Sequence, residues 1–296
     1  MLTIRLTLMR VISKVSVPIL PGARLSEILK ASLLLVSAIS VLACSAMKPT
    51  TPSACITRNS PVIRIGTYNV FTGTHNVPQT VRVIQQMNAD VLTLQELSPE
   101  GSKLLDRALK RDYPYRYFFE GVAILSRFKL SHPRYEHSHR GINGFLFAEI
   151  TSPGGRMQIA SLHLDPLRVW TPREKWSLPL QLLWGQAGIH RAEVEQIIGA
   201  LQPGLPTILA GDFNSASHAA IKRMQMLGYT DTFAEVTPHP DRISTLHFEL
   251  LGFHAGRRID FILRDRSFKT IESQVLPGAP SDHDSVVSVL CWNREP

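Results

Sequence analysis

The sequence predicts a layered domain of alternating β-strands and α-helices. Strand-type and helix-type patterns alternate from residue 62 onward, and each predicted strand is short and self-contained. The 296 residues include 44% apolar and 19% charged residues, which is enough apolar material for a sizeable core. We therefore expect one large folded domain after an N-terminal leader, rather than a disordered chain.

The N-terminal residues 1–43 are predicted to form a signal peptide. Residues 31–43 are uncharged and mostly apolar, which suits a signal-peptide core and is too short for a membrane-spanning helix. The sequence Val-Leu-Ala-Cys that ends at Cys44 is similar to a bacterial lipobox, which makes this cysteine a candidate lipidation site. Ordinary cleavage after Ala43 or Ala46 is the alternative. We expect export across the inner membrane, to the periplasm, to a lipid-anchored position or to the medium.

The charge of the chain excludes few classes of function. Residues 1–44 contain five basic residues and one acidic residue, so 27 basic and 23 acidic residues remain, and the net charge of +8 falls to +4 for the rest of the chain. This excess is too small to predict nucleic-acid binding from charge alone.

The first part of the folded domain is predicted to contain two strands and two helices. Residues 62–69 alternate apolar and polar side chains, as a half-buried strand does, and residues 91–96 form an apolar run of strand length. Residues 77–89 have apolar side chains at helical spacing and a proline in the first turn, and a second helix is predicted at 103–110.

The middle of the chain is predicted to contain three strands and a helix, at residues 121–126, 144–150, 157–164 and 189–201. Residues 166–188, which precede this helix, contain three of the four tryptophans, interleaved with basic residues. Helix packing is the simpler interpretation of these tryptophans, and contact with a substrate is the alternative.

The next strand begins at Thr207, stops at Gly211 and is followed by Asp212 and Asn214. Residues i and i+2 of an extended segment point the same way, so both oxygen-bearing side chains could reach one metal or one phosphate. An Asx turn is the alternative, because Asp and Asn favour turns for local reasons. The remaining predicted elements are a helix at 219–227 and strands at 257–263 and 281–290.

Polar residues lie at the ends of several of these strands. Asp260 interrupts an apolar strand, where an unpaired carboxylate would be destabilising, so it requires a partner. His283 is the candidate partner, because a carboxylate orients an imidazole and raises its basicity. His163 is either a core histidine bonded to backbone or a site residue at the same edge as Asn69 and Glu96.

The polar motifs occur in an order that resembles the endonuclease/exonuclease/phosphatase superfamily. The resemblance covers about residues 61–291, and the order is more specific than any single motif. The motifs are Asn69, Gln95-Glu96, the strand at 121–127, His163, Asp212 with Asn214, Arg258 with Asp260, and Ser281 with Asp282 and His283. The resemblance implies an α+β fold, a four-layer α/β/β/α sandwich with two mostly antiparallel, mixed sheets packed face to face. The catalytic domain would then span residues 61–293.

The resemblance also implies a Mg²⁺ or Mn²⁺ site. Closely spaced carboxylates require a cation, and oxygen ligands favour these two ions over zinc. Glu96, with Asn69 nearby, is the first metal-ligand candidate, and Asp282 would share the ion.

Further roles in phosphoester hydrolysis follow from the resemblance. Asp212 and Asn214 would orient the attacking water or hold a second ion. His283, oriented by Asp260, would be the general base or would bind the phosphoryl oxygens. His163 would stabilise those oxygens or assist the leaving group.

Some positions are candidates for supporting roles. Glu120 would orient His163, or it is a solvent-exposed loop residue. Arg140, Trp170 and Trp176 are candidate substrate contacts.

Two cysteines lie at opposite ends of the mature domain. Residues 44–60 are rich in proline, threonine and serine and are expected to form a flexible tether that contains Cys55. If Asn69 and His283 line one site, the first and last strands run antiparallel and Cys291 lies within reach of Cys55. A disulfide between these cysteines is therefore a candidate, and a free Cys55 with a buried Cys291 is the alternative.

The substrate stays open at this point. A nuclease is the first hypothesis, and a sphingomyelinase-like or inositol-phosphatase-like hydrolase of phospholipid head groups or small phosphoesters is the second. A non-catalytic binding module is the third, although a full set of candidate catalytic residues argues against it. The partners would then be a nucleic acid or phospholipid head group and, through the N-terminus, a membrane, with the protein expected to be a monomer.

Overall fold

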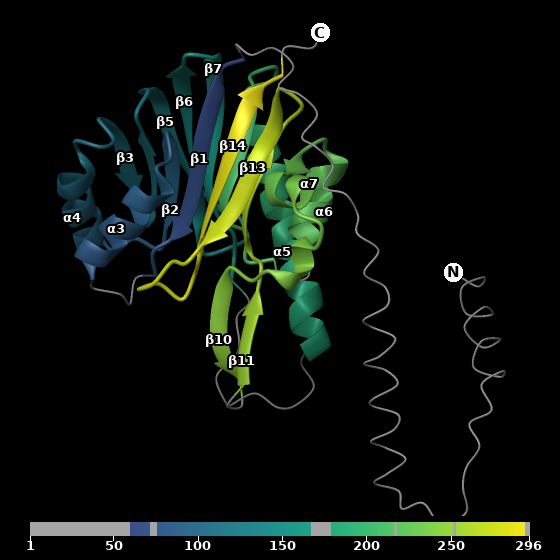
Figure 1. Ribbon diagram of the computed structural model, residues 1–296. Helices are drawn as coiled ribbons and strands as arrows, with labels where there is room; N and C mark the ends of the chain where they lie inside the picture. Colours follow the sequence, from purple (N-terminus) through teal and green to yellow (C-terminus); the bar gives the residue numbers. More distant parts are fainter. Residues whose placement is uncertain (1–59, 72–75, 167–178, 216–217, 251–252, 294–296) are drawn as a thin grey trace, which may run out of the picture. The chain divides into compact units, whose positions relative to one another are not determined.

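The computed structural model describes residues 60–293, apart from residues 72–75, 167–178, 216–217 and 251–252 (Figure 1). The predicted signal peptide and residues 44–59 of the predicted tether lie outside the described residues. Within the described part of the chain, no helix has the length and apolar character needed to cross a membrane.

Two six-stranded sheets form the centre of the domain (Figure 1). The first sheet has the order β13 (Phe268–Leu276), β14 (Ser285–Trp292), β1 (Val62–Asn69), β2 (Val91–Gln95), β4 (Val122–Ser126) and β3 (Tyr115–Phe119). The second has the order β5 (Lys129–His137), β6 (Gly144–Ser152), β7 (Gly155–His163), β8 (Thr207–Asp212), β12 (Asp260–Arg264) and β9 (Thr230–Asp231). Among the described strands, β1 with β2 and β7 with β8 pair in parallel, and the other ladders are antiparallel.

Helices cover the outer face of each sheet. On the first sheet, Ile84 of α3 shares a buried cluster with Leu92 of β2, and on the second, Val194 of α5 shares one with Leu162 of β7. The covering helices are α3 (Val77–Met87) and α4 (Pro99–Leu109) on the first sheet, and α5 (Pro179–Ala200) and α6 (Ala219–Met226) on the second. This arrangement confirms the predicted four-layer α/β/β/α sandwich.

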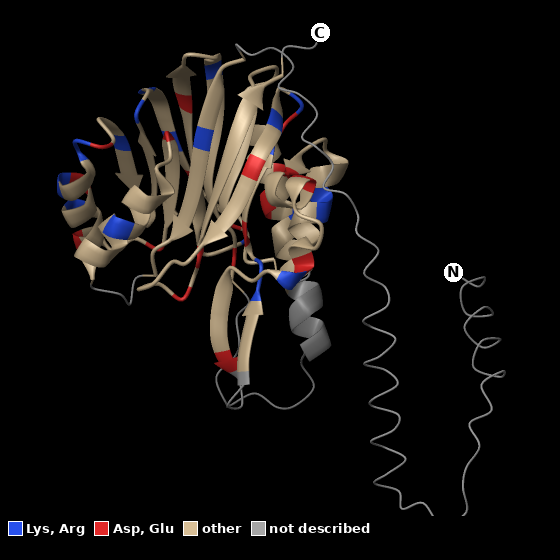
Figure 2. Cartoon of the chain, in the orientation of Figure 1, with Lys and Arg blue, Asp and Glu red and all other residues tan. Residues whose placement is uncertain are grey.

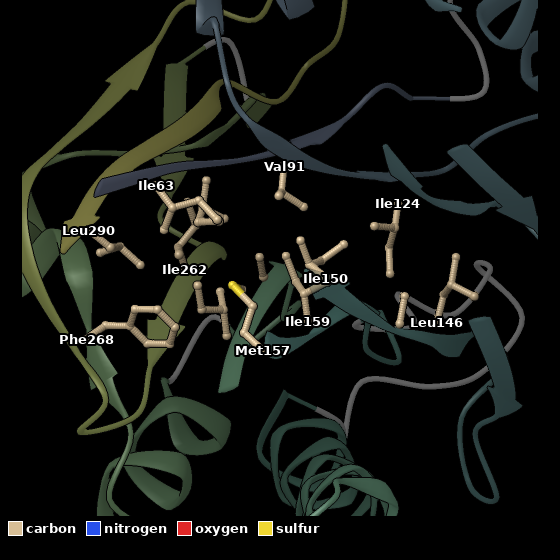
Figure 3. Packing of buried hydrophobic residues seen from close by; sticks show 14 of the residues in the cluster. Ile63, Val91, Ile124, Leu146, Ile150, Met157, Ile159, Ile262, Phe268 and Leu290 are labelled. Carbon is tan, nitrogen blue, oxygen red and sulfur yellow. The ribbon is translucent and has the colours of Figure 1, made fainter. Parts of the chain in front are cut away.

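A third apolar cluster lies between the two sheets (Figure 3). Ile63 of β1 and Ile124 of β4 belong to it, together with Ile150 and Ile159 of the second sheet, and all four are buried. Successive side chains of a strand point to opposite faces, so the inner positions of β1 alternate with outer ones such as Tyr68, which belongs to the cluster under α3. Each buried side chain of this size contributes roughly 1.5–3 kcal/mol.

Local sequence explains where the first helices begin and end. The Asn76 side chain accepts a hydrogen bond from the backbone N–H of Gln79 at 3.2 Å and caps α3. This helix ends at Asn88, a residue in the left-handed region at φ 46°. Ser98 caps α4 in the same way through Gly101, at 3.0 Å. The helix therefore begins at Pro99, four residues before the predicted start.

Several strands were not predicted. β3, β5, β9 and β13 are present in the structure, and so are a hairpin at 246–257, the short helix α7 (Thr232–Val236) and the 3-10 turn η1 (Pro240–Arg242). β3 and β4 form a hairpin whose turn residues, Glu120 and Gly121, both have positive φ, 43° and 79°, as a two-residue type I′ turn requires. Helix α5 begins ten residues before its predicted start.

A two-stranded hairpin projects from one end of the sandwich (Figure 1). Its strands, β10 (Leu246–Leu250) and β11 (Phe253–Arg257), pair with each other and belong to neither sheet. At its base, Leu246 forms an isolated bridge with His283. The hairpin therefore lies next to the loop that precedes β14.

Candidate active site

The inner face of the sandwich changes from apolar to polar toward one end of the sheets. On β1, the inward positions read Ile63, Ile65, Thr67 and Asn69, all of them buried. β7 shows the same change and ends at His163. Because alternate residues of a strand share a face, these polar side chains continue the face that forms the core.

A layer of bonded polar side chains lies between this core and the site. Thr93 Oγ1 donates to Thr67 Oγ1 at 2.8 Å, and Thr67 Oγ1 donates to Gln95 Oε1 at 3.3 Å. Gln95 Nε2 then donates to Ser161 Oγ at 3.2 Å and so connects the two sheets. All four residues are fully buried and bonded, which gives the site a rigid base. This layer was not predicted from the sequence, although Thr67 and Ser161 lie two residues before the predicted site residues Asn69 and His163.

Three neighbouring strands of the second sheet place His163, Asp212 and Asp260 in one row. His163 pairs with Asp212 in the parallel ladder, and Asp212 pairs with Asp260 in the antiparallel ladder. Gly211 has φ 153°, and a Cβ there would lie 2.0 Å from the carbonyl oxygen of Leu162, so only glycine fits before Asp212.

Asn69 and Glu96 approach this row from the first sheet. Asn69 Nδ2 donates to Glu96 Oε1 and to Asp212 Oδ2, both at 3.0 Å, and its Oδ1 accepts from the backbone of Phe71. Glu96 has φ 55°, an unfavourable conformation for a residue with a side chain, directly after β2. Its carboxylate lies 3.7 Å from His163 Nε2. Asn69, which was predicted as a metal ligand, thus holds two carboxylates with its amide N–H groups, and its oxygen bonds to the backbone of Phe71 instead.

Asp260 and His283 form a buried pair. Asp260 Oδ2 lies 2.9 Å from His283 Nδ1, and the two residues are 1% and 5% exposed. His283 Nε2 faces Asp212 Oδ2 at 3.9 Å. Ser281 Oγ donates to the carbonyl of Asn69 at 2.8 Å and accepts from the backbone N–H of His283 at 3.0 Å. The loop that bears the histidine is therefore fastened to the end of β1.

The electrostatics of these residues reflect burial and close packing of acids. Burial, and then the charge of Asp260, raise the pKa of Asp212 to about 8. Burial lowers the pKa of His163, although the charge of Glu96 opposes this. Burial alone would lower the pKa of His283, but the charge and the hydrogen bond of Asp260 raise it to about 10. The site therefore favours added positive charge.

A divalent cation fits this group of residues. Glu96, Asp212 and His283 each offer one ligand atom, and these atoms all lie within 4.8 Å of one another. Asp260 Oδ1 and His163 Nε2 are buried and have no hydrogen-bond partner among the described residues. Figure 2 shows acidic residues at the end of the sheets from which the hairpin projects. The two carboxylates of this group suit a hard cation, which would offset the negative charge of Asp260 that helps to raise the pKa of Asp212.

A family model described as the Endonuclease/Exonuclease/phosphatase family matches residues 66–283. This match extends from β1 to His283, the partner of Asp260. It includes the row formed by His163, Asp212 and Asp260, and it includes Glu96, Asp212 and His283, which we call the cation group. The chain belongs to the endonuclease/exonuclease/phosphatase family. The resemblance inferred from the order of the motifs is thereby confirmed. No curated protein matches the chain.

Solved structures with this family's fold are similar to the chain. A family protein from Beutenbergia cavernae is 18% identical with a TM-score of 0.59, over 78% of this chain and 72% of that chain. TDP2 from D. rerio, complexed with a single strand DNA product, is 17% identical with a TM-score of 0.61, over 77% and 98%. Truncated TDP2 from Caenorhabditis elegans is 17% identical with a TM-score of 0.59, over 78% and 98%. At these identities the likeness concerns the fold.

Two predicted site residues lie apart from the cation group of this family member. Asp282 is half-buried, with Oδ1 3.5 Å from Ser281 Oγ, and its carboxylate is not part of the group formed with Glu96. Asn214 has φ 46°, and its backbone N–H donates to Asp212 Oδ1 at 2.7 Å. The segment therefore forms an Asx turn, and Asp212 and Asn214 do not project together from an extended strand. Asn214 Nδ2 instead donates to the carbonyl of Leu164, at 3.0 Å.

The supporting residues have separate positions. Glu120 is exposed in the β3–β4 turn, and no contact with His163 is found among the described residues, so its solvent-exposed interpretation fits the structure. Arg140 is exposed in the loop between β5 and β6. Trp170 and Trp176 lie outside the described residues.

Of the three cysteines, only Cys291 lies among the described residues. Cys291 is buried in β14 and disulfide-bonded. Its partner lies outside the described residues, as do Cys44 and Cys55. The pairing of Cys291 with Cys55 and the lipidation of Cys44 therefore stay predictions.

Proposed function

We propose that this protein is an exported, Mg²⁺-dependent phosphodiesterase that acts on nucleic acid. One observation supports this more than any other: His163 and His283 direct Nε2 toward Asp212 Oδ2 from 4.0 and 3.9 Å, beside Glu96. Around this space, the two imidazoles can donate hydrogen bonds to phosphoryl oxygens, and the two carboxylates can hold a cation and orient a water. Family membership supports the same class of hydrolase.

The buried pair gives His283 its role. Asp260 accepts the hydrogen bond of Nδ1–H, so Nε2 faces the space beside Asp212. In this orientation His283 donates to a phosphoryl oxygen. His163 Nε2, which has no hydrogen-bond partner among the described residues, donates to a second one. Asp212 orients the attacking water.

Glu96 is the proposed principal ligand of the cation. Its side chain is 27% exposed, whereas those of Asp212 and His283 are 1% and 5% exposed, so Glu96 lies at the mouth of the site. Asn69 holds its carboxylate in place. When bound, a divalent cation neutralises charge on the phosphodiester and makes it a better target for a nucleophile. We propose Mg²⁺ as this ion, with Mn²⁺ able to replace it.

Nucleic acid is the proposed substrate class because the D. rerio TDP2 structure that shares this fold contains a single strand DNA product. A phospholipid head group is the competing substrate. The same residues would bind its phosphoryl group, and only the residues around them would distinguish it from a nucleic acid.

A parallel assay tests the proposal. The mature chain is tested with Mg²⁺ against plasmid DNA, RNA, sphingomyelin, phosphoinositides and bis-p-nitrophenyl phosphate, with chelator controls. We expect Mg²⁺-dependent cleavage of DNA or RNA. Hydrolysis of the lipids alone would replace the nuclease proposal with a lipid hydrolase, and full activity in chelator would contradict the metal role.

Export is proposed from the leader and is supported by the disulfide at Cys291, because disulfides persist in oxidising compartments. Fractionation of cells expressing the wild type and Cys44→Ala tests it. A lipoprotein should lose its membrane association in the variant. Full-length, unprocessed protein in the cytoplasm would contradict export.

A further inference from the structure

Thr245 connects the two members of the Asp260–His283 pair. It is fully buried (0% exposed) and belongs to none of the motifs found in the sequence. Its Oγ1 accepts hydrogen bonds from the backbone N–H groups of Ile259 at 3.0 Å and Asp260 at 3.1 Å. Its carbonyl oxygen accepts from the N–H of Asp284 at 2.6 Å. One residue therefore bonds to the backbone beside both members of the pair.

The start of β12 depends on this hydroxyl. β9 pairs with β12 at Leu263 and Arg264, so within the described part of the chain no strand covers this edge at Asp260. Thr245 Oγ1 takes the place of a ladder partner. A buried N–H without an acceptor is destabilising, so the hydroxyl determines where the backbone of Asp260 lies.

The same region fixes the loop that precedes β14. Leu246 forms its bridge with His283, and the N–H of His247 donates to the carbonyl of Asp282 at 2.9 Å. Together with the bond from Asp284 to Thr245, these contacts hold the backbone on both sides of His283. Residues 245–247 thus help to position both members of the pair, whose side chains lie 2.9 Å apart.

We propose that Thr245 is a positioning residue for phosphodiester hydrolysis and that it acts through the Asp260–His283 pair. The kinetic side of this inference rests on the proposed function. Without the hydroxyl, the start of β12 shifts relative to the loop, and His283 Nε2 loses its alignment. A misplacement of about 1 Å in a catalytic group lowers a rate by roughly 100-fold.

Two substitutions separate the hydroxyl from the size of the side chain. Thr245→Val keeps the shape and removes the acceptor, and we expect kcat to fall by roughly 10- to 100-fold with little change in KM. Thr245→Ser keeps the acceptor and should restore kcat. Thr245→Ala is a second variant without the hydroxyl, in case the valine variant does not fold. Full kcat in a folded variant that lacks the hydroxyl would overturn the inference.

Thr232→Val is the matched control. Thr232 is equally buried, and its Oγ1 donates to the carbonyl of Ile262 in the same strand, at 2.9 Å, but away from the pair. This variant should lose stability and keep kcat. An equal loss of kcat in Thr232→Val would show that any weakening of β12 lowers activity, which contradicts a specific role for Thr245.

A double-mutant test and a spectroscopic test complete the experiment. Because Thr245 acts through the pair, Thr245→Val should cost little further kcat in an Asp260→Asn background, and multiplicative losses would contradict this. The NMR resonance of His283 Nδ1–H, bonded to Asp260, should persist in Thr245→Ser and Thr232→Val and be lost in Thr245→Val. Persistence in Thr245→Val overturns the inference. This readout still applies if the wild type hydrolyses no phosphodiester, in which case only the proposed function fails.

Discussion

At the scale of single residues, the site combines side chains with unequal exposure and separate tasks. Asn69 Nδ2 holds Glu96 and Asp212, and Asp260 holds His283. Glu96 alone of the cation group is substantially exposed. Glu96, Asp212 and His283, which would contact a ligand, are thus held in place by Asn69 and Asp260, which would not.

Glu96→Gln tests the cation site. The substitution removes one ligand charge and keeps the shape, so activity should fall by orders of magnitude and more Mg²⁺ should be required, with the fold intact. Steady-state rates across a Mg²⁺ titration measure this, with circular dichroism as the folding control. Near wild-type turnover at low Mg²⁺ would remove Glu96 from the ligand set.

Asp260→Asn and His283→Ala test whether the pair works as a unit. Asp260→Asn should remove much of the rate because the imidazole loses its orienting carboxylate. Adding His283→Ala should then cost little more. Rates of the two single variants and the double variant decide this, and fully multiplicative losses would mean that the residues act separately.

The sequence was informative for residues with paired chemistry and uninformative for those that act through geometry. The need of Asp260 for a partner could be argued from an acid in an apolar run, and the structure places His283 beside it. The donor role of Asn69 depends on which atoms surround its amide in three dimensions. The role of Thr245 could not be predicted, because a single threonine outside the strands belongs to no recognisable sequence pattern.

At the scale of elements, helix α5 holds the loop between β5 and β6 and the segment after His163. Glu193 of α5 is fully buried and accepts hydrogen bonds from Ser138 Oγ at 2.8 Å and from the backbone N–H of Asp165 at 3.2 Å. The Asp165 carboxylate in turn accepts from the N–H of Ile142 at 3.0 Å. The loop that contains Arg140 is thereby bonded both to α5 and to the segment that follows His163.

Glu193→Gln tests how this carboxyl responds to pH. Burial raises the pKa of Glu193 from 4.5 to about 7, so the folded state binds its proton more tightly than the unfolded state does. Its contribution to stability is therefore full below about pH 4.5 and is lost as pH rises to about 7. The stability of the wild type relative to Glu193→Gln should fall by roughly 2–4 kcal/mol between about pH 4 and pH 8.

Denaturant unfolding of the two proteins across this pH range measures the difference. Glu195→Gln is the matched control, because Glu195 lies on the same helix but is 49% exposed and pairs with Arg223 at the surface. A constant difference between wild type and Glu193→Gln would contradict the account of the buried carboxyl.

Elements with a clear period were predictable, and those without one were not. β1 matches its predicted range because its inner and outer faces differ. β3 is partly exposed along its length, and β13 has a register shift between Thr270 and Glu272, so neither shows a clean alternation. The β10–β11 hairpin packs into neither sheet, and no buried face imposed a pattern on it.

At the scale of the whole molecule, the disulfide at Cys291 connects the last strand of the first sheet to a cysteine outside the described residues. Val62 pairs with Cys291 across β1 and β14, so residues just before β1 lie at the same edge. Cys55 is seven residues before Val62. This proximity favours Cys55 over Cys44 as the partner.

Reduction should therefore destabilise the exported protein. A bridge between Cys55 and Cys291 would close a long loop. For such a loop the chain-entropy model gives a contribution to stability of about 4–5 kcal/mol, which is an upper value. Non-reducing peptide mapping should find a peptide with Cys55 linked to Cys291, and thermal unfolding with reductant should shift to lower temperature. Two titratable thiols in the mature domain, with no linked peptide, would exclude the bridge.

The central claim is that the polar end of the sandwich is a metal-dependent phosphodiesterase site. The most direct test is Mg²⁺ readdition to the chelator-treated mature chain, with hydrolysis of bis-p-nitrophenyl phosphate and DNA followed in parallel. We expect no hydrolysis after treatment and a saturable return with Mg²⁺. Unchanged hydrolysis after chelation, or folded protein that cleaves no phosphodiester with Mg²⁺ or Mn²⁺, would contradict the claim.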